Sequence, residues 1–338
     1  MDVEERLALL GAVSERLEAH AEELGELITQ EMGKPRAAAV GEARGWAKNA
    51  RTELEEIRRA IEPEWHETEN NRVQLVRDPL GVVAAITPWN FPIGMPFQIL
   101  LPALGTGNTV VFKPSEMVPL VGAKIAELLG EGLPPGVLEL VQGDGALGAA
   151  LVESDVNMIG FVGSRATGIK IMSAAAGGLK RLVLELGGKD PLIVMADADL
   201  ESAAECAVRH SLRNTGQVCC SVERVYVADE IADAFEARVI EKAKEWNCGD
   251  PLDESVKLGP MVSALQRQKV ETQLAAAQAA GARVAFRGEV PAGAGFYHAP
   301  VVLTNVAADQ EITHEETFGP VVSLTRFSGD EAEAVRLA

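Results

Sequence analysis

The sequence predicts an α/β protein made of two doubly wound α/β domains. From Gly81 onward, short apolar runs alternate with helical stretches. Runs that are apolar throughout are typical of parallel strands covered by helices on both faces. The pattern begins again after Pro191, which indicates two such units with a boundary near Gly187–Pro191. We therefore expect domains at residues 1–188 and 189–338, and a chain of 338 residues suits two domains of about 150 residues each.

The N-terminal segment is predicted to form two amphipathic helices. The first apolar stripe keeps helical spacing until Gly33 and Pro35, and it consists of Leu10, Val13, Leu17, Leu24 and Ile28. The second stripe stops at Pro63, and it consists of Trp46, Ala50, Leu54, Ile57 and Ile61. The segment from Glu64 to Asp78 is polar and extended in character, so we take residues 64–80 as an extended arm that leaves the domain.

Five apolar strands are predicted for the first domain: Val82–Ile86, Thr109–Phe112, Val137–Val141, Met158–Val162 and Leu182–Glu185. Helical stretches separate them at Val121–Leu129, Leu147–Glu153 and Gly168–Ala175. The second domain is predicted to contain helix Leu200–Arg213, strand Val225–Val227, and helices Ile231–Trp246 and Leu265–Ala280. Strands that alternate with helices in this way favour a parallel sheet in each domain.

The composition excludes several classes of protein. A formal net charge of −19 argues against nucleic acid and anionic membrane surfaces, since both require a basic footprint. Residues Pro79 to Phe112 carry no charge, which is long enough to resemble a membrane span. Four prolines and several amide side chains interrupt this stretch, so it indicates a buried core that contains a site.

Cysteine and histidine usage points to a reducing, cytoplasmic setting without a metal site. The four cysteines form no C-x-x-C pair, and the five histidines are scattered along the chain. The acidic N-terminus lacks the basic start and apolar core of a signal peptide.

A glycine-rich turn follows the third predicted strand. Gly143–Gly148 matches G-x-G-x-x-G, whose glycines let backbone N–H groups approach a pyrophosphate. A plain strand-to-helix turn explains the same residues, and both interpretations stay open at this point.

Three side chains stand where chemistry could occur. Cys219 follows a predicted helix in a loop, where a lowered pKa would make it a nucleophile, although an inert buried thiol is the alternative. Glu185 ends an apolar strand, so partial burial would make it a general base, unless it faces solvent or pairs with Arg181. Asn90 lies in a proline-flanked turn and could donate its amide to an oxyanion, or the turn could be purely structural.

A polar turn follows the second predicted strand at Lys113–Glu116. Open α/β sheets bind ligands at the carboxyl ends of their strands, so Lys113 and Glu116 could hold ribose hydroxyls. A solvated turn is the alternative.

Taken together and in this order, these motifs resemble those of the aldehyde dehydrogenase superfamily over essentially the whole chain. The six blocks that carry the resemblance are Pro88–Pro92, Lys113–Glu116, Phe161–Ser164, Leu184–Lys189, Gly216–Cys219 and Glu316–Pro320. The resemblance implies an enzyme that oxidises a small-molecule aldehyde to a carboxylic acid with NAD, or with NADP. It also implies that residues 1–188 bind the cofactor and that residues 189–338 form the catalytic domain.

The resemblance also implies the roles of individual residues. Cys219 would be the nucleophile, with Cys220 as a bystander. The Asn90 amide and the Cys219 N–H would hold the oxyanion, and Glu185 would activate the water that releases the acid from a thioester. The implied cofactor residues are Trp89, Lys113, Ser115, Glu116, Gly163, Ser164, Leu186, Glu316 and Phe318. The resemblance implies that Lys113 and Glu116 contact the adenosine ribose and Ser164 the pyrophosphate. It also implies that Glu316 contacts the nicotinamide ribose and that Phe318 packs near the nicotinamide. Because Glu116 would repel a 2′-phosphate, NAD is the favoured cofactor.

Further expectations concern the substrate and the extent of the chain. Arg213 lies in a segment similar to succinate-semialdehyde dehydrogenases, where an arginine recognises the substrate carboxylate. Gln98 stands where those enzymes often carry a second arginine. Family members continue well past Glu316–Pro320, so we expect a chain shortened at its C-terminus, whose full-length form is a homo-oligomer, a dimer or a tetramer.

Three alternatives to the dehydrogenase stay open at the level of sequence. They are an inactive NAD-binding fragment of such an enzyme, a hydrolase that uses the same cysteine without a cofactor, and an acylating dehydrogenase that transfers the thioester to coenzyme A. Glu185 argues against the last, because thioester transfer needs no base to activate water.

Overall fold

The computed structural model describes residues 1–338 and divides the chain into two units. Unit 1 contains Met1–Glu31 and Ala39–Leu186, and unit 2 contains Met32–Ala38 and Gly187–Ala338. The sequence carried no signal that Met32–Ala38 joins unit 2. The segment is held there because the Arg36 N–H donates to the Pro251 carbonyl at 2.9 Å and Gly33 packs against Pro260. A Cβ on Gly33 would lie 2.5 Å from the Pro260 ring, and its φ of +80° also favours glycine.

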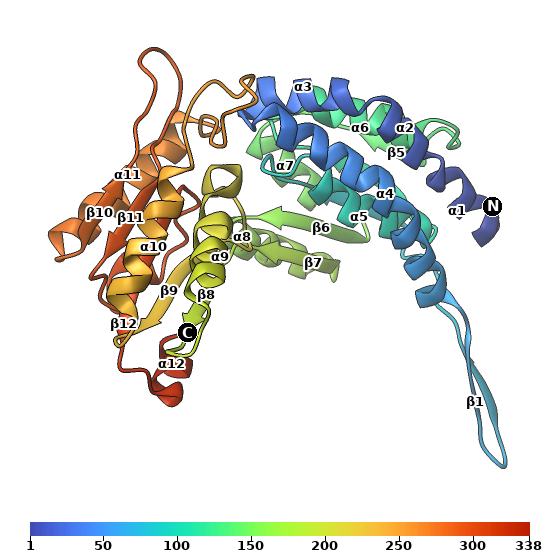
Figure 1. Cartoon of the computed structure of the whole chain (residues 1–338). Coiled ribbons are helices and arrows are strands. Elements are labelled where there is room, and N and C mark those ends of the chain that lie inside the picture. Colours follow the sequence, from blue (N-terminus) through green and yellow to red (C-terminus); the bar gives the residue numbers. More distant parts are fainter. The chain divides into compact units, whose positions relative to one another are not determined.

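The N-terminal part forms four helices rather than the two that we predicted. They are α1 (Val3–Gly11), α2 (Val13–Ala19), α3 (Ala21–Met32) and α4 (Arg36–Ile61) (Figure 1). The first predicted helix is divided at Ala12, which caps α1 with right-handed backbone angles, and at His20, where φ is −109° and ψ is 14°. All five residues of its apolar stripe are nevertheless buried. Apolar spacing therefore continues across both breaks and could not reveal them.

The predicted arm is a hairpin of β1 (Glu64–Glu67) and β2 (Arg72–Leu75) that follows α4. The two strands pair antiparallel, and every residue in them is exposed. Figure 1 shows the hairpin extending away from the helices of unit 1.

The sheet of unit 1 contains the five predicted strands in the order β5-β4-β3-β6-β7, all parallel. Their bounds are β3 (Val82–Ile86), β4 (Thr109–Lys113), β5 (Leu138–Leu140), β6 (Met158–Gly163) and β7 (Arg181–Leu186). The helices between them are α5 (Gly94–Gly105), α6 (Pro119–Gly130), α7 (Gly145–Glu153) and α8 (Arg165–Ala175). Helix α5 was not predicted, because Pro96 and Pro102 argue against a helix in that stretch. Nine of its residues are nevertheless buried. The uncharged stretch is thus strand and helix of a core, as expected, and none of the helices is long and apolar enough to cross a bilayer.

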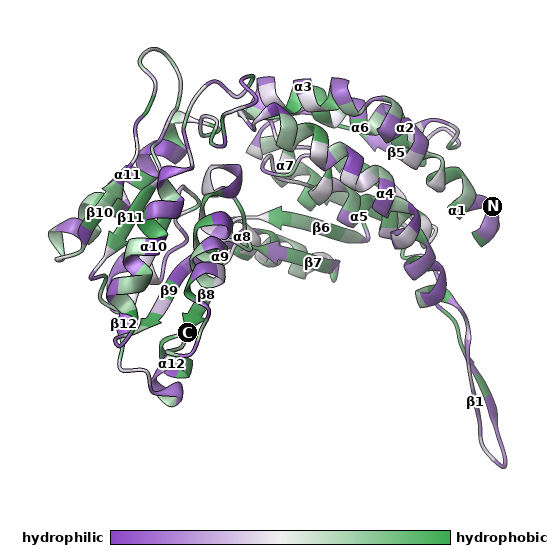
Figure 2. Ribbon diagram, in the orientation of Figure 1, coloured by the Kyte–Doolittle hydropathy of each residue, from purple (hydrophilic) through white to green (hydrophobic).

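The sheet of unit 2 has the order β10-β11-β12-β9-β8, in which β10 runs antiparallel and the other strands run parallel. The strands are β8 (Asp190–Val194), β9 (Val222–Ala228), β10 (Arg283–Arg287), β11 (Val301–Thr304) and β12 (Val321–Phe327). The helices are α9 (Leu200–Leu212), α10 (Ala232–Lys244), α11 (Ala264–Ala279) and α12 (Glu331–Leu337). Only β9 among these strands was predicted, whereas α9, α10 and α11 lie within a residue or two of their predicted bounds. Figure 2 shows β6 and β12 largely in the hydrophobic range, as expected of interior strands.

Candidate functional site

A cavity of 770 Å³ opens where strands β3, β4 and β6 of unit 1 end. Because these strands are parallel, their carboxyl ends meet at one edge of the sheet. Five of the predicted cofactor residues line the cavity: Trp89, Lys113, Ser115, Glu116 and Gly163. Residues far apart in the sequence are therefore brought together where open α/β sheets bind ligands.

Lys113 and Glu116 form a polar pair on this cavity. The Lys113 side chain is buried, and its Nζ donates to the Pro114 carbonyl at 3.2 Å. The same Nζ lies 3.7 Å from Oε2 of Glu116, whose side chain is 53% exposed. An ammonium donor beside an exposed carboxylate acceptor suits the vicinal hydroxyls of a ribose.

The start of helix α8 offers a place for a phosphate beside the cavity. Ser164 caps the helix, and its Oγ accepts the Thr167 N–H at 3.3 Å. The helix N-terminus presents further N–H groups and a partial positive charge. Ser164 itself is exposed, and its neighbours Gly163 and Thr167 line the wall. Leu186 packs behind this helix, where its side chain fills the space that a Cβ on Gly168 would need.

The glycine-rich turn contributes Gly145 and Gly148 to the same cavity. Asp144 caps helix α7 by accepting the Ala146 N–H at 2.9 Å, which is what an ordinary strand-to-helix turn does. The turn is therefore part of the wall, and its local hydrogen bonding is that of a helix cap.

Asn90 and Glu185 also belong to unit 1. Asn90 is buried, 3% exposed, in the turn that follows β3. Glu185 is exposed, so our expectation of partial burial was wrong. The reason is that β7 is an edge strand whose side chains alternate, and Arg181, Val183 and Glu185 share its exposed face.

Cys219 of unit 2 follows a strained segment of backbone. Helix α9 ends at Leu212, and the next turn contains three successive residues with left-handed backbone, Asn214 (φ 54°), Thr215 (φ 57°) and Gly216 (φ 70°). Left-handed backbone costs about 1–3 kcal/mol at a non-glycine residue, and it persists only where surrounding contacts hold it. Thr215 Oγ1 donates to the Gly259 carbonyl at 3.1 Å, and a Cβ on Gly216 would lie 2.0 Å from the Gly319 carbonyl oxygen.

The Cys219 thiol is half-buried, and burial raises its pKa above the usual value. The neighbouring Cys220 raises this pKa further, while the backbone N–H groups of Cys219 and Cys220 oppose the shift. Arg213 Nη2 lies 3.6 Å from the Cys220 sulfur, so its guanidinium borders the same loop. A raised pKa lowers the fraction of thiolate, the nucleophilic form, at any given pH.

The loop that contains Glu316 and Phe318 packs beside the cysteine. Glu316 Oε1 accepts the Gly188 N–H at 3.1 Å, and a Cβ on Gly188 would lie only 2.2 Å from the Cys219 carbonyl oxygen. Burial raises the pKa of Glu316, an effect that the Gly188 N–H opposes. The structure thus brings Cys219, Gly188 and Glu316 together.

The side chains that support this loop were not predicted from the sequence. Lys189 and Glu223 form an ion pair at 2.5 Å with both side chains nearly buried. A charged residue inside the apolar strand around Val225 was the available signal, because buried charges need a partner. The structure contains no cluster of three or more His, Cys, Asp or Glu side chains arranged to hold a metal ion.

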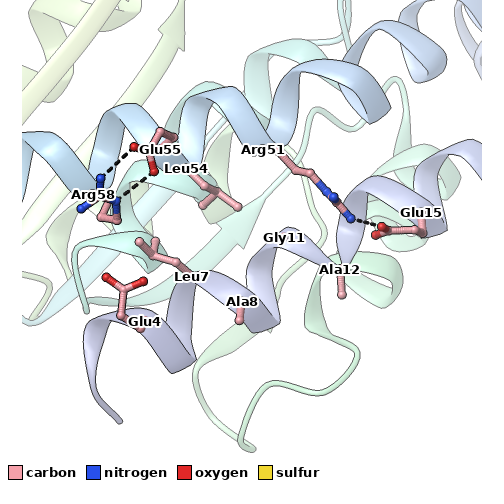
Figure 3. A pocket seen from close by; sticks show the side chains of 10 residues that line it. All are labelled: Glu4, Leu7, Ala8, Gly11, Ala12, Glu15, Arg51, Leu54, Glu55 and Arg58. Carbon is pink, nitrogen blue, oxygen red and sulfur yellow. Dashed lines mark hydrogen bonds and ion pairs between the residues drawn. The ribbon is translucent and has the colours of Figure 1, made fainter.

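A second groove of 620 Å³ lies between the helices α1, α2 and α4 of unit 1 (Figure 3). Its floor includes Leu7 and Leu54, and its arginines are already paired. Arg51 pairs with Glu15, and Arg58 pairs with Glu55 at 2.8 Å. Since its cations are neutralised by neighbours, we assign no ligand to this groove.

Comparison with known proteins places the chain in a family. The model of the "Aldehyde dehydrogenase family" matches residues 1–338. The chain is 40% identical to a betaine aldehyde dehydrogenase from Cereibacter sphaeroides over 338 residues, which is 98% of this chain and 69% of that protein. It is also 40% identical to the mitochondrial succinate-semialdehyde dehydrogenase of Arabidopsis thaliana, over 99% of this chain and 64% of that protein. The crystal structure of an NAD-dependent aldehyde dehydrogenase from Sinorhizobium meliloti superposes with a TM-score of 0.95 at 38% identity, covering 100% of this chain and 68% of the other.

Proposed function

Since this chain belongs to the aldehyde dehydrogenase family, we propose that it oxidises an aldehyde to a carboxylic acid with NAD, through a thioester on Cys219. The observation that carries this proposal is the cysteine loop. A half-buried thiol directly follows a strained turn and lies beside the Glu316 loop, and strain of this kind clusters at active sites.

The proposed chemistry begins at the Cys219 sulfur. The thiol gives up its proton to solvent, and the sulfur adds to the aldehyde carbonyl carbon to form a C–S bond as the carbonyl π electrons move to oxygen. The Asn90 amide and the Cys219 N–H donate to the oxyanion that develops on the carbonyl oxygen. When bound, NAD would supply the acceptor for the hydride of this carbon, which would leave a thioester on Cys219.

Release of the acid needs one water molecule and a base. Glu185 accepts a proton from water as the water oxygen adds to the thioester carbon. The C–S bond then breaks, the Cys219 sulfur is set free and the carboxylic acid leaves. Exposure of Glu185 is compatible with this role, because a base for hydrolysis must reach water.

The residues around the cavity of unit 1 fit NAD. Lys113 and Glu116 match the needs of the adenosine ribose, and the start of α8 at Ser164 suits a pyrophosphate. The exposed Glu116 carboxylate would repel the 2′-phosphate of NADP, so we propose NAD as the preferred cofactor.

The proposed substrate class is a semialdehyde, an aldehyde that also bears a carboxylate. Arg213 supports it, because its guanidinium borders the cysteine loop through Cys220 and a guanidinium binds carboxylate well. Comparing turnover of succinate semialdehyde with that of hexanal tests this point. We expect the semialdehyde to be preferred, and a clear preference for hexanal would refute it. A cytoplasmic location and a homo-oligomeric state stay predictions from the sequence.

The test of the reaction is the appearance of NADH absorbance with purified protein and a small panel of aldehydes. We expect turnover that Cys219→Ser abolishes and that the matched variant Cys220→Ser retains. Equal turnover in both variants would rule out Cys219 as the nucleophile. A folded protein that binds NAD but turns over no aldehyde would favour an NAD-binding fragment.

A further inference from the structure

A buried carboxylate lies beneath the loop that carries Glu316 and Phe318. Glu223 is 6% exposed, and it comes from β9, far from this loop in the sequence. Its Oε2 accepts the Thr317 N–H at 2.8 Å, and its Oε1 accepts the Phe318 N–H at 2.9 Å. One side chain therefore binds two successive backbone N–H groups.

The two N–H groups belong to a strained turn. Phe318 has a φ of 53°, in the left-handed region that costs a non-glycine residue about 1–3 kcal/mol. Successive N–H groups around a left-handed residue form a concave anion-binding nest. In this protein the anion in the nest is the Glu223 carboxylate.

The carbonyl groups of the loop are held from the opposite side. Gln266 Nε2 donates to the carbonyl oxygens of Thr317 and Phe318 at 3.3 and 3.0 Å. Gln273 Nε2 donates to the Glu316 carbonyl at 3.4 Å. Hydrogen bonds thus hold both the N–H groups and the carbonyl groups of the loop backbone. Glu223 is the only negatively charged side chain among these hydrogen-bond partners.

Lys189 compensates the charge of Glu223. Its Nζ lies 2.5 Å from Glu223 Oε2 and 3.1 Å from Thr317 Oγ1. Lys189 directly follows Gly188, whose N–H binds the Glu316 carboxylate. Lys189 and Glu223 therefore join the loop to the same turn that packs against Cys219.

We propose that Glu223 is a positioning residue for the cofactor. It holds Thr317 and Phe318 in the left-handed turn that presents Glu316 and Phe318 to the nicotinamide-ribose end of NAD. This inference rests on the proposed function, since it needs NAD as the cofactor. In this role Glu223 acts through the backbone of the loop.

The hydrogen-bond partners of Glu223 make the role testable by a nearly isosteric change. Every group that the carboxylate contacts is a donor: two N–H groups and an ammonium. In Glu223→Gln, either orientation of the amide sets its NH₂ against a donor. The variant therefore keeps the size of the side chain but loses the hydrogen bond to one of the two backbone N–H groups.

A matched control is Glu236→Gln. Glu236 is another carboxylate of unit 2, its side chain is 16% exposed, and it forms ion pairs with Arg283 and Arg326. It lies on α10, and its ion pairs are with residues outside the Glu316 loop. This variant shows how far KM, kcat and hydrogen exchange change when a partly buried, ion-paired carboxylate elsewhere in unit 2 is lost.

The experiment compares KM for NAD, kcat and amide hydrogen exchange in the three proteins. For Glu223→Gln we expect KM for NAD to rise about tenfold, the equivalent of one charge-assisted hydrogen bond. We expect kcat to change less, and exchange to accelerate in the peptide that contains Thr317 and Phe318. Glu236→Gln should leave KM and this exchange unchanged. An unchanged KM with slow exchange in Glu223→Gln would overturn the proposal.

Two further measurements keep the result decisive. Hydrolysis of p-nitrophenyl acetate by Cys219 needs no cofactor, so it should be retained in Glu223→Gln, and an equal loss of ester and NAD-dependent turnover would indicate a merely structural role. If Glu223→Gln does not fold, Glu223→Asp keeps the charge, retracts it by one methylene and should raise KM for NAD less.

Different measurements test the proposed function and the role of Glu223. Wild-type protein that shows no NAD-dependent turnover would remove the proposed function. Hydrogen exchange of the Glu316 loop would still decide whether Glu223 holds it.

Discussion

The cavity of unit 1 and the cysteine loop of unit 2 are built in different ways. The cavity uses regular elements, namely the ends of three parallel strands and the start of one helix. The cysteine loop uses left-handed residues, side-chain clamps and a buried ion pair. Binding a cofactor needs donors and acceptors at fixed positions, which regular elements supply. Strained backbone of this kind clusters at active sites, which agrees with the proposed role of the Cys219 thiol.

Replacing the proposed base tests this contrast most strongly. For Glu185→Gln we expect steady-state turnover to fall by about 10²–10⁴-fold, because water is no longer activated. The first turnover should still release NADH, since hydride transfer precedes hydrolysis. Stopped-flow absorbance measures both phases. Loss of the first phase together with the second would place Glu185 in an earlier step.

Replacing one glycine by alanine in each region compares directly how well the two regions tolerate an added Cβ. Gly216 has a φ of 70°, and a Cβ there would lie 2.0 Å from the Gly319 carbonyl oxygen. We expect Gly216→Ala to lower the free energy of unfolding by about 2–4 kcal/mol. Gly145 begins helix α7, and a Cβ there would meet nothing within 4 Å, so Gly145→Ala should change stability by less than about 0.5 kcal/mol. Urea denaturation gives both values, and equal losses would contradict the contrast.

Lys113 and Glu116, the proposed cofactor pair of unit 1, should give a smaller effect that is confined to cofactor binding. We expect Lys113→Met to raise KM for NAD about tenfold through loss of a charge-assisted donor. The rate of p-nitrophenyl acetate hydrolysis should stay the same. The matched control is Lys124→Met, because Lys124 pairs with Glu23 at 3.3 Å away from the cavity lining. A change in KM of the same size in the control would remove the assignment of Lys113.

The most subtle effect is the pH dependence of the Cys219 thiol. Burial raises its pKa, so at a given pH the fraction of thiolate should be smaller than for an exposed cysteine. Alkylation by iodoacetamide, followed by mass spectrometry of the Cys219 peptide without cofactor, should accelerate steadily through pH ~9. A plateau below pH ~8 would show instead that the folded protein lowers this pKa.

The same contrast explains what could be predicted from the sequence. The strands of unit 1 were predicted because each is a short apolar run between turns, and Lys113 and Glu116 follow directly from their position after one of them. The helix breaks at Ala12 and His20 could not be predicted, since the apolar spacing continues through them.

The residues that hold the Glu316 loop could not be predicted from the sequence, for a related reason. Glu223 is separated from Thr317 and Phe318 by most of unit 2, and its role depends on tertiary contacts that leave no local pattern. The exposure of Glu185 likewise follows from the edge position of β7, which is a property of the whole sheet. Motifs identified the candidate reacting residues, whereas the geometry that holds them required the fold.

The most direct test of the central claim is to trap the covalent intermediate on Cys219. Glu185→Gln protein is mixed with aldehyde in the presence or absence of NAD, quenched in acid after one turnover and mapped by peptide mass spectrometry. We predict an acyl group of the aldehyde's mass less one hydrogen on the Cys219 peptide, formed only with NAD. An acyl group on another residue, or NADH release with Cys219 unmodified, would contradict the account.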